Sequence, residues 1–279
     1  MDFQPTEERR MLADMIGKFI QNDYPLKERL TAGASALGYC PAAYSAMAQL
    51  GLIGALFEEE VGGFGGSGFD IATVFTELGK GLVVEPLNDT ALTTGYILAQ
   101  TDQLDLVEQI VLGEKRVALG LIENGADYDW SAPETLARKT DAEWQLNGVK
   151  TSVKFAHGAD ALVVSAQTQS APGISLFLIE AAAPGLAEHP FQTVDGGNAC
   201  EITLHNTPAQ LLGVEGAAYP LIDAAAARAT LALCAEALGL MERIKDMTID
   251  YMRTRKQFGS ELGKFQALQH RVAQMLLEI

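Results

Sequence analysis

Apolar residues recur with the helical period of about 3.6 residues through the first part of the chain. The clearest example lies between Thr6 and Ile20, where Thr6 is a candidate N-cap and the two acidic residues after it suit the positive end of a helix. The same spacing continues over four further segments, residues 41–50, 69–79, 90–99 and 102–112. We therefore expect residues 1–113 to form a helical domain.

The pattern changes after Gly113. Short runs rich in β-branched and aromatic residues alternate with Gly, Pro, Asn and Asp, and they occupy residues 116–123, 144–153, 161–167, 174–180 and 200–206. Within the second run, Asn147-Gly148 is a common two-residue hairpin turn. The pattern predicts a middle β-domain, a barrel or sandwich, over residues 114–213.

Helical spacing returns at Tyr219-Pro220, where proline suits the first turn of a helix. The helix is expected to continue to about Gln257, which at 1.5 Å per residue is a length of about 55 Å. Gly259 is expected to break it, and a second helix is expected from about Ser260 to the last residue. Two helices cannot bury broad apolar faces alone, so residues 214–279 are expected to be the first two helices of an incomplete bundle, continued by further chain or by a partner. The fold class is α+β.

Composition narrows the classes of function. The chain has 279 residues, of which 48% are hydrophobic, and a formal net charge of −16, which disfavours nucleic-acid binding. Cys40, Cys200 and Cys234 are too widely spaced to indicate a disulfide framework or a zinc site, and we expect no metal. The N-terminus lacks the succession of a signal peptide, and no membrane span is expected, so we expect a cytoplasmic protein.

A glycine-rich segment, "EEEVGGFGGSGFD", occupies residues 58–70. Its spacing matches neither the P-loop nor the dinucleotide-binding fingerprint, and no lysine follows it into the next helix. We therefore expect a structural turn between helices rather than a phosphate-binding loop.

Residues 251–270, "YMRTRKQFGSELGKFQALQH", carry four cations around an aromatic-glycine step: Arg253, Arg255, Lys256 and Lys264. A guanidinium one turn before a helix break and the N-terminus of the next helix would together suit a pyrophosphate. The alternative is a solvated face whose cations neutralise acidic neighbours.

Four segments resemble the acyl-CoA dehydrogenase family of flavoproteins. They are "LFEEEVGGFGG", "ALGLIENGADYD", "LNGVKTSVKFAHGADALVVSA" and "RKQFGSELGKFQALQHRVAQM", of which the last is the most specific. The order of helical, β and helical domains agrees with that family along the whole chain. The similarity is greatest to the branch that contains small subunits such as pimeloyl-CoA dehydrogenase small subunit.

The resemblance implies FAD as cofactor, with the last segment reaching a neighbouring subunit's FAD. Arg255 and Gln257 would contact the diphosphate, and aromatic and aliphatic residues would pack around the nucleotide. The residues implied on this side of the cofactor are Arg255, Gln257, Phe258, Phe265, Gln266 and Leu268.

The resemblance also implies that the flavin ring lies against the β-domain. The segment at the pyrimidine edge would be Leu121, Ile122 and Glu123, and the strand passing N5 would be Ser152, Val153 and Lys154. The family's usual aromatic and hydroxyl residues on that strand are here Ser152 and Lys154. A lysine there would stabilise reduced flavin if it faces the ring, or would point to solvent.

The family reaction needs a carboxylate that removes the α-proton of the thioester while the β-hydrogen leaves as hydride to flavin N5. In most of the family this base lies beyond Ile279, and in a minority it lies near Ala229-Thr230, neither of which is acidic here. Asp223 and Glu236 are expected at the surface. The four histidines (His157, His189, His205, His270) are expected in loops or packing, so no catalytic base is identified.

Three functions remain open. The first is an FAD-dependent acyl-CoA dehydrogenase of fatty acid β-oxidation, a homo- or hetero-oligomer (dimer or tetramer) that takes an acyl-CoA substrate and passes electrons to an electron-transfer flavoprotein or similar acceptor. The second is a non-catalytic partner subunit that completes a neighbour's FAD site. The third is a flavin monooxygenase on the same fold, in which no α-proton base is needed.

Overall fold

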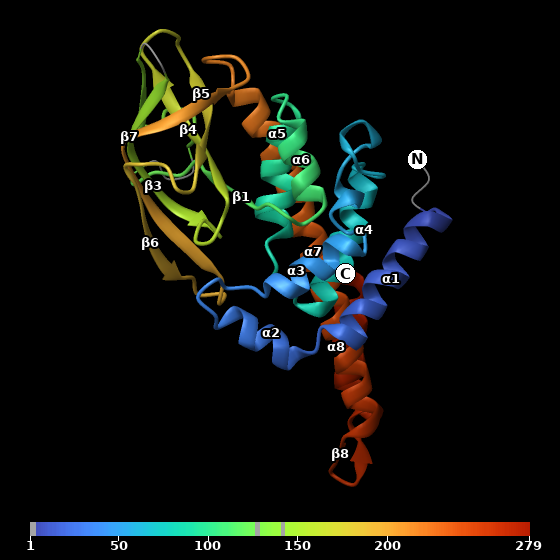
Figure 1. The fold of residues 1–279 in the computed structure, drawn as a ribbon. Helices are drawn as coiled ribbons and strands as arrows, with labels where there is room; N and C mark the ends of the chain where they lie inside the picture. The colour runs from blue at the N-terminus through green and yellow to red at the C-terminus, as the bar shows by residue number, and fades with distance from the viewer. Residues whose placement is uncertain (1–3, 126–128, 141–142) are drawn as a thin grey trace. The chain divides into compact units, whose positions relative to one another are not determined.

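The computed structural model describes residues 4–125, 129–140 and 143–279 (Figure 1). The chain forms two compact units, each discontinuous in sequence. One consists of Leu26–Ile71 and Val84–Leu231, and the other of Met1–Pro25, Ala72–Val83 and Ala232–Ile279. The predicted division at residues 113/114 and 213/214 is a different one, and it stays a prediction.

The helices up to residue 112 agree largely with the apolar pattern. They are α1 (Glu7–Asp23), α2 (Leu26–Gly33), α3 (Pro41–Gln49), the short 3-10 turns η1 (Gly54–Leu56) and η2 (Glu59–Val61), α4 (Gly68–Gly81), the π-helix η3 (Leu87–Thr94), α5 (Gly95–Ala99) and α6 (Leu104–Val111). Thr6 caps α1 as expected, because its hydroxyl accepts from the Arg9 N–H at 3.3 Å. The pattern missed α2, and it did not show that a π-helix precedes α5.

The glycine-rich segment is a structural turn that leads into α4, as expected. A Cβ atom on Gly63 would lie 2.1 Å from the carbonyl oxygen of Phe57. Only glycine therefore permits this approach of one backbone stretch to another.

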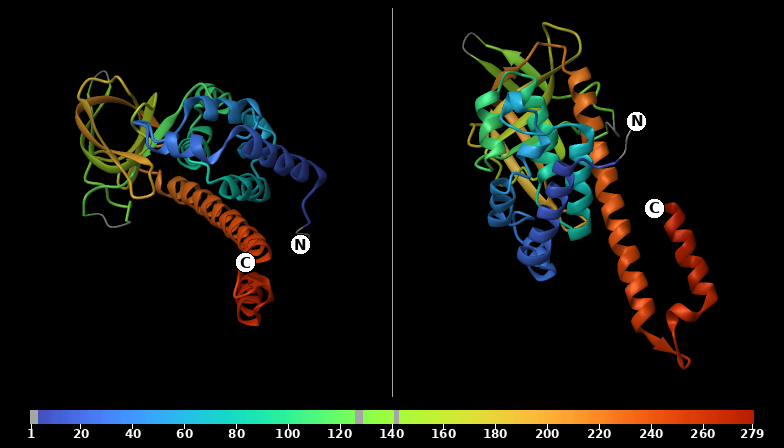
Figure 2. Two further views of the ribbon diagram at one scale, coloured as in Figure 1. Left: turned by 90° about the horizontal axis from the view of Figure 1, so that it is seen from below. Right: turned by 90° about the vertical axis from the view of Figure 1, so that its right-hand side faces the viewer.

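Seven strands of the described chain form one sheet. They are β1 (Val117–Gly120), β2 (Leu136–Lys139), β3 (Trp144–Lys154), β4 (Ala161–Thr168), β5 (Ile174–Glu180), β6 (Leu186–Gln192) and β7 (Asn198–Leu212). The order is β1-β4-β2-β3-β7-β5, with β6 on β7, and a further β4–β5 pairing closes the sheet into a barrel (Figure 2, left). Alternate residues of the strands fill its interior, including Trp144, Leu146, Val153, Phe177 and Ile202. The predicted β-domain is thus a barrel.

The hairpin predicted at Asn147-Gly148 is wrong. Strand β3 runs straight through these residues, with a register shift against β7 between Leu146 and Gly148. The Asn147 side chain instead binds Asn206 across the strands, with Nδ2 donating to Oδ1 at 3.0 Å. The pair marks a β-bulge rather than a turn.

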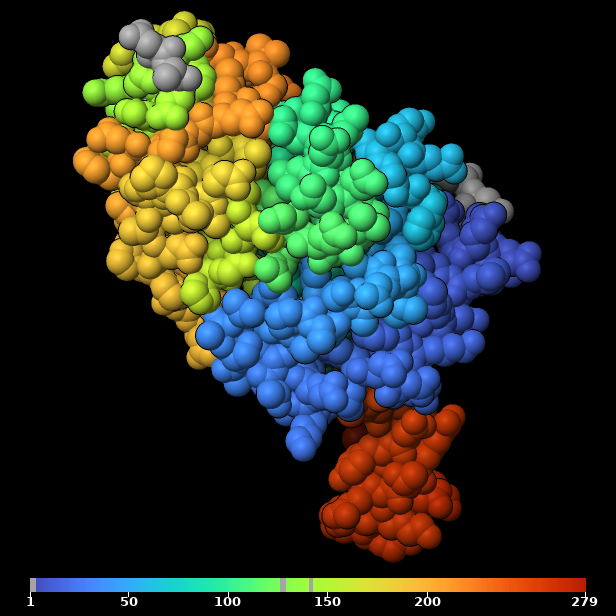
Figure 3. Space-filling model, viewed as in Figure 1, coloured from blue at the N-terminus to red at the C-terminus, as the bar shows by residue number. Residues whose placement is uncertain are grey.

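Helical residues pack on one side of the barrel. The link between α2 and α3 meets the start of β7, where the Asn198 side-chain amide donates to the carbonyl of Ala36 at 2.6 Å. Figure 3 shows the blue surface of this helical region adjoining the yellow surface of the barrel. The barrel and the helices that frame its outer face therefore belong to one unit.

The C-terminal part contains the long helix α7 (Tyr219–Thr254), the strands β8 (Lys256–Gln257) and β9 (Ser260–Glu261), the 3-10 turn η4 (Leu262–Lys264) and α8 (Gln266–Glu278). The expected simple break at Gly259 is wrong, because Phe258 and Gly259 both have positive φ, 55° and 78°. These values suit the type I′ turn of a two-residue hairpin. Helix α8 therefore starts at Gln266 rather than Ser260, and it runs back beside the end of α7 (Figure 2, right).

One helix of the described residues, α7, is long and apolar enough to span a membrane by length and composition. Its most apolar window of 18 residues has a mean hydropathy of 1.4, and a single helix of this kind is weak evidence for a membrane span. Within its unit, α7 also carries Glu242, which forms an ion pair with Lys80 of α4 at 3.1 Å. At that point the helix packs against protein through charged side chains.

Candidate functional site

Two segments predicted to face a flavin lie side by side on the barrel. The N–H of Thr151 in β3 donates to the carbonyl of Ile122 at 2.8 Å, which joins the segment after β1 to β3. Ile122 is 41% exposed, and Ser152 and Lys154 are also exposed. These three side chains share the outer surface, and Leu121 beside them is half-buried.

Two of the predicted residues point the other way. Val153 is 1% exposed and belongs to the barrel core, and Glu123 is 6% exposed. Their side chains cannot meet a ligand on the outer surface, so any contact from these positions comes from the backbone. Residues 126–128, within the segment "ALGLIENGADYD", lie outside the described residues.

Glu123 belongs to a buried ion pair that the sequence reasoning missed. The Nζ atom of Lys150, a fully buried side chain, lies 2.5 Å from Glu123 Oε1 and 2.9 Å from Ser165 Oγ. Glu123 also accepts from Thr135, through the backbone N–H at 3.1 Å and the hydroxyl at 2.6 Å, and from the Glu134 N–H. Burial acts to raise the pKa of Glu123, but these donors outweigh it and hold the pKa below its ordinary value. The pair ties the end of β1 to β2, β3 and β4.

Strand β3 has strained backbone conformations beside this ion pair, and they change which of its side chains face outward. Ser152 and Phe155 have φ values of 52° and 53°, in the left-handed region that residues other than glycine rarely adopt. The pairing of β3 with β7 shifts register between Lys150 and Val153. Such strain costs about 1–3 kcal/mol per residue and gathers at functional sites. The bulge places Lys150 inside the barrel while Ser152 and Lys154 stay outside.

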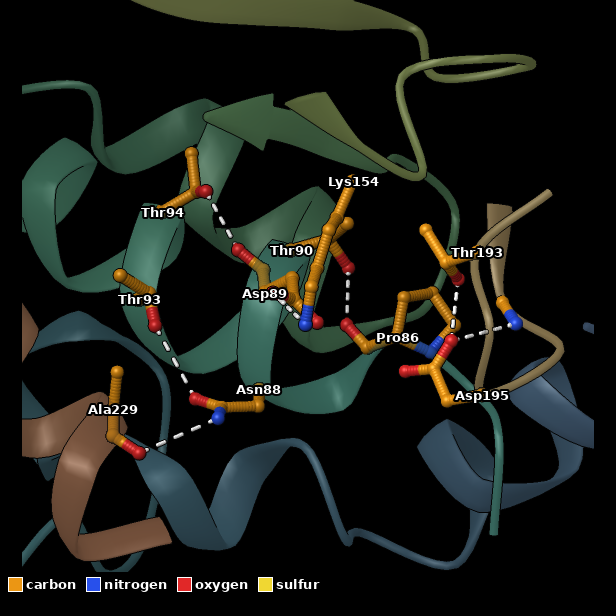
Figure 4. A network of polar contacts seen from close by, with 11 residues as sticks. Pro86, Asn88, Asp89, Thr90, Thr93, Thr94, Lys154, Thr193, Asp195 and Ala229 are labelled. Carbon is orange, nitrogen blue, oxygen red and sulfur yellow. Dashed lines mark hydrogen bonds and ion pairs between the residues drawn. The ribbon is translucent and has the colours of Figure 1, made fainter. Parts of the chain in front are cut away.

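Lys154 faces a carboxylate from the helical region. Its Nζ atom lies 3.8 Å from Oδ1 of Asp89, which sits in the π-helix η3 (Figure 4). Burial raises the pKa of the Asp89 carboxyl, Lys154 opposes this, and the nearby Asp195 adds to it. Asp195 is itself held by the hydroxyl of Thr193 and by the Gly197 N–H, and these hydrogen bonds lower its pKa. Sequence reasoning missed both aspartates, because neither belongs to a recognisable motif.

The helix η3 also touches α7 at Ala229, near the position where the resemblance implies the base of a minority of the family. The side-chain amide of Asn88 donates to the carbonyl of Ala229 at 3.4 Å, and its oxygen accepts from the Thr93 hydroxyl at 3.3 Å. The Thr230 hydroxyl binds the carbonyl of Ala226. This wall of the site thus carries amide and hydroxyl groups from Asn88 and the threonines, with Asp89 as its neighbouring acid.

The predicted diphosphate residues gather on the β8–β9 hairpin, in the other unit. Arg255, Gln257 and Phe258 are exposed, and Phe258, 92% exposed, stacks edge-on against Phe265 with ring centres 6.3 Å apart. The Arg255 carbonyl accepts from the Leu262 N–H at 2.9 Å, which fixes the hairpin to the next turn. The structure therefore brings Phe258 and Phe265 together.

Helix α8 begins just beyond. Its N-cap, Phe265, has no side-chain hydrogen bond to the helix, and Gln266 and Leu268 in the first turn are exposed. A groove of about 290 Å³ lies between this helix and the end of α7, lined largely by Ile249, Met252, Val272 and Leu276. Free N–H groups, an exposed cation and an apolar groove in one unit are features that a dinucleotide would use.

The alternative interpretation, a solvated face whose cations neutralise acidic neighbours, holds for two of the four cations in residues 251–270. Arg253 lies 3.8 Å from Asp250 and Lys264 lies 3.9 Å from Glu261. In the described part of the chain neither Arg255 nor Lys256 has an acidic side chain within 4 Å. These two cations are therefore the ones available to an anionic ligand.

Other candidates lie elsewhere. Asp223 is exposed, as expected, and His157 pairs with Glu188 at 3.1 Å on the barrel. Among the residues that the structure describes, no group of three or more His, Cys, Asp or Glu side chains could hold a metal ion.

Comparison with known proteins supplies the context. Three domain models of acyl-CoA dehydrogenases match in order: the N-terminal domain at residues 6–100, the middle domain at 118–207 and the C-terminal domain at 220–279. The chain is 28% identical to the short-chain-specific acyl-CoA dehydrogenase of Clostridium acetobutylicum, over 99% of this chain and 76% of that protein.

Solved structures agree. Butyryl-CoA dehydrogenase from Megasphaera elsdenii superposes with a TM-score of 0.89 and 25% identity, over 99% of this chain and 77% of that one. A chain of the ChsE4-ChsE5 complex from Mycobacterium tuberculosis superposes with a TM-score of 0.84 and 25% identity, over 98% and 74%. Each similarity extends through all three domains.

Proposed function

The chain belongs to the acyl-CoA dehydrogenase family of oxidoreductases, and on this premise we propose that it catalyses the FAD-dependent α,β-dehydrogenation of an acyl-CoA thioester. The observation that carries the proposal is the outward face formed by Ile122, Ser152 and Lys154. These exposed side chains lie at the positions that the resemblance implies for the flavin, on segments held by a buried ion pair.

The residues present fit such a cofactor. Ile122 would offer an apolar contact to the ring, and the backbone of Leu121, Glu123 and Val153 would offer polar groups. On the other unit, Arg255 and Gln257 would meet the diphosphate of an FAD bound by a neighbouring chain, with Phe258, Phe265, Gln266 and Leu268 around the nucleotide. When bound, FAD would supply the acceptor for the β-hydrogen of the substrate as hydride.

The rest of the chain serves this face in three ways. The Lys150–Glu123 pair fixes β1 against β3, so the two flavin-facing segments keep one geometry. The bulge at Ser152 keeps Lys154 outside the barrel. The contact of Asn88 with Ala229 holds η3 against α7, which gives the site a second wall.

A second function is favoured by one specific observation. Neither Ala229 nor Thr230 is acidic, so the wall that carries the base in a minority of the family has none at that position. A partner subunit that completes a neighbour's FAD site would need no base of its own. Two similar structures carry paired names, the ChsE4-ChsE5 complex and the Tcur3481-Tcur3483 steroid ACAD, and this supports a hetero-oligomer as the setting.

The wider setting follows from the family. We propose that the protein is cytoplasmic, acts in fatty acid β-oxidation and passes its electrons to an electron-transfer flavoprotein or similar acceptor. Assignment to the small-subunit branch of the family is part of the same proposal.

The test is spectroscopic. Protein purified with FAD is expected to show flavin absorption that bleaches when acyl-CoA thioesters of increasing chain length are added without oxygen. A preparation that neither carries nor takes up FAD contradicts the proposal. Turnover by the homo-oligomer alone excludes the partner-subunit function, and hydroxylation that consumes oxygen identifies a monooxygenase instead.

A further inference from the structure

A charged pair lies on the barrel surface proposed above to face a flavin ring. Lys154 extends from the end of β3, on the same outer face as Ile122 and Ser152. Its side chain is 52% exposed, and that of its partner Asp89 is 34% exposed. The ammonium group therefore remains accessible to a ligand while a carboxylate stands 3.8 Å behind it.

The carboxylate is held in place by an unusual helix. Asp89 lies in η3, a π-helix, whose wide turns are rare and occur often at functional sites. The hydroxyl of Thr94 donates to the Asp89 carbonyl at 2.8 Å, and that of Thr90 donates to the Pro86 carbonyl at 2.7 Å. Both bonds lie within the helix and its N-cap, and the Asn88 side chain ties the helix to Ala229 of α7 (Figure 4). Asp89 is thus positioned before any ligand binds.

A second carboxylate lies nearby but is already engaged. Asp195 accepts from the Thr193 hydroxyl and, at 3.1 Å, from the Gly197 N–H, so it stabilises its own turn. Its charge still acts on both members of the pair. Asp89 is the acid that faces Lys154 directly, and its removal changes the charge at Lys154 most.

The position of a cation matters to a flavin because reduction adds negative charge to the ring. Two electrons and one proton convert the oxidised ring to its anionic reduced form. A nearby ammonium group stabilises that form and raises the reduction potential, and a carboxylate beside the ammonium weakens the effect.

We propose that Lys154 sets the reduction potential of the flavin bound to this face, and that Asp89 is a positioning residue that moderates its charge. The inference rests on the proposed function, since it requires bound FAD. It goes beyond that function in assigning a task to Asp89, which lies outside the family motifs in this chain. A simple surface ion pair of the same two residues would leave the flavin unaffected.

The experiment measures the midpoint potential of FAD bound to the full chain, by titration with dithionite in the presence of a reference dye. Lys154→Met is expected to lower the potential, so that the ratio of reduced to oxidised flavin falls at least tenfold at a fixed potential, or about 30 mV for two electrons. Asp89→Asn is expected to raise it. The opposite signs distinguish charge tuning from general damage to the site.

Two further variants test the route of the effect. Lys154→Arg keeps the cation and is expected to restore a potential close to that of the native chain. In the Lys154→Met background, Asp89→Asn is expected to shift the potential less than it does in the native chain, because Asp89 acts through Lys154. Equal shifts in both backgrounds would contradict the positioning role of Asp89.

The matched control is Lys139→Met. Lys139 is an exposed cation that pairs with Trp144, at the other end of β3, about 30 Å along the strand from Lys154. Its loss changes the net charge equally and is expected to leave the potential unchanged.

The outcomes separate the two claims. Bound flavin whose potential changes less than threefold in reduced-to-oxidised ratio in both Lys154→Met and Asp89→Asn overturns the inference and leaves the proposed function standing. Failure of the native chain to bind FAD overturns both.

Discussion

The buried pair of Lys150 and Glu123 provides the sharpest test of how the flavin-facing strands are held. We consider Lys150→Met, which keeps a long flexible side chain of similar volume and removes the charge. Lys150 is fully buried, and its Nζ binds both Glu123 and Ser165. The substitution would leave the Glu123 carboxylate inside the barrel with donors from Thr135 and Glu134 but no countercharge.

Breaking a buried ion pair by removal of one partner costs about 3–5 kcal/mol, because the remaining charge is desolvated without compensation. For a unit of this size, each kcal/mol lowers the melting temperature by about 2–4 °C. We therefore expect Lys150→Met to lower the melting temperature of the barrel unit by roughly 6–20 °C. Urea titration followed by the fluorescence of the barrel's Trp144 gives the free energy directly.

The matched control is Lys154→Met, the same change four residues along the same strand. Lys154 is half-exposed, so its loss is expected to change the free energy of unfolding by less than about 0.5 kcal/mol. The double variant Glu123→Gln with Lys150→Met is expected to cost at least about 2 kcal/mol less than the sum of the single variants. A cost below about 1 kcal/mol for Lys150→Met, or additive single variants, would refute the reasoning.

Three further predictions concern the turn, the pH response and the hairpin. Gly63→Ala is expected to destabilise the protein by more than about 3 kcal/mol in urea titration, because the new Cβ would lie 2.1 Å from the Phe57 carbonyl oxygen. The control Gly62→Ala has open space around the new Cβ and is expected to cost only about 1–2 kcal/mol, because Gly62 has a positive φ. Equal costs for the two variants would contradict this. The folded-state pKa of Glu123 lies below its ordinary value of 4.5, so its stabilisation is complete above that value and is lost as the pH falls through the folded pKa. Acid titration of unfolding should therefore show a shallower loss of stability in Glu123→Gln, and parallel curves would argue against it. Arg255→Ala is expected to weaken FAD binding at least tenfold in equilibrium dialysis without changing the melting temperature of the FAD-free protein, since Arg255 is exposed; unchanged affinity would remove it from the diphosphate site.

Apolar periodicity predicted most helices and strands, because the spacing of apolar residues shows which face of a helix or strand is buried. It failed where the backbone was decided by contacts distant in sequence. Asn147-Gly148 has the composition of a turn, yet β3 continues through it because the strand pairs with β7 on both sides of the bulge. The turn at Phe258-Gly259 was read as a helix break, since a phenylalanine at positive φ is rare and gives no signal of a hairpin.

The sequence likewise predicted only part of the candidate site. The motif positions Ile122, Ser152 and Lys154 could be named from the sequence, and the structure places their side chains on one surface. The motif does not indicate whether a side chain at such a position faces the barrel interior or the solvent. Glu123 and Val153 were therefore predicted as flavin contacts together with the exposed residues, whereas the structure buries both side chains. Asp89 escaped notice because the π-helix that presents it has no sequence pattern of its own.

The measurement that tests the central claim most directly is the absorption spectrum of the purified protein with FAD, before and after anaerobic addition of an acyl-CoA. The account predicts a flavin spectrum that bleaches as the thioester is oxidised to its α,β-unsaturated form. A protein assembled with its natural subunits that binds FAD and keeps its colour with thioesters of every chain length would contradict it.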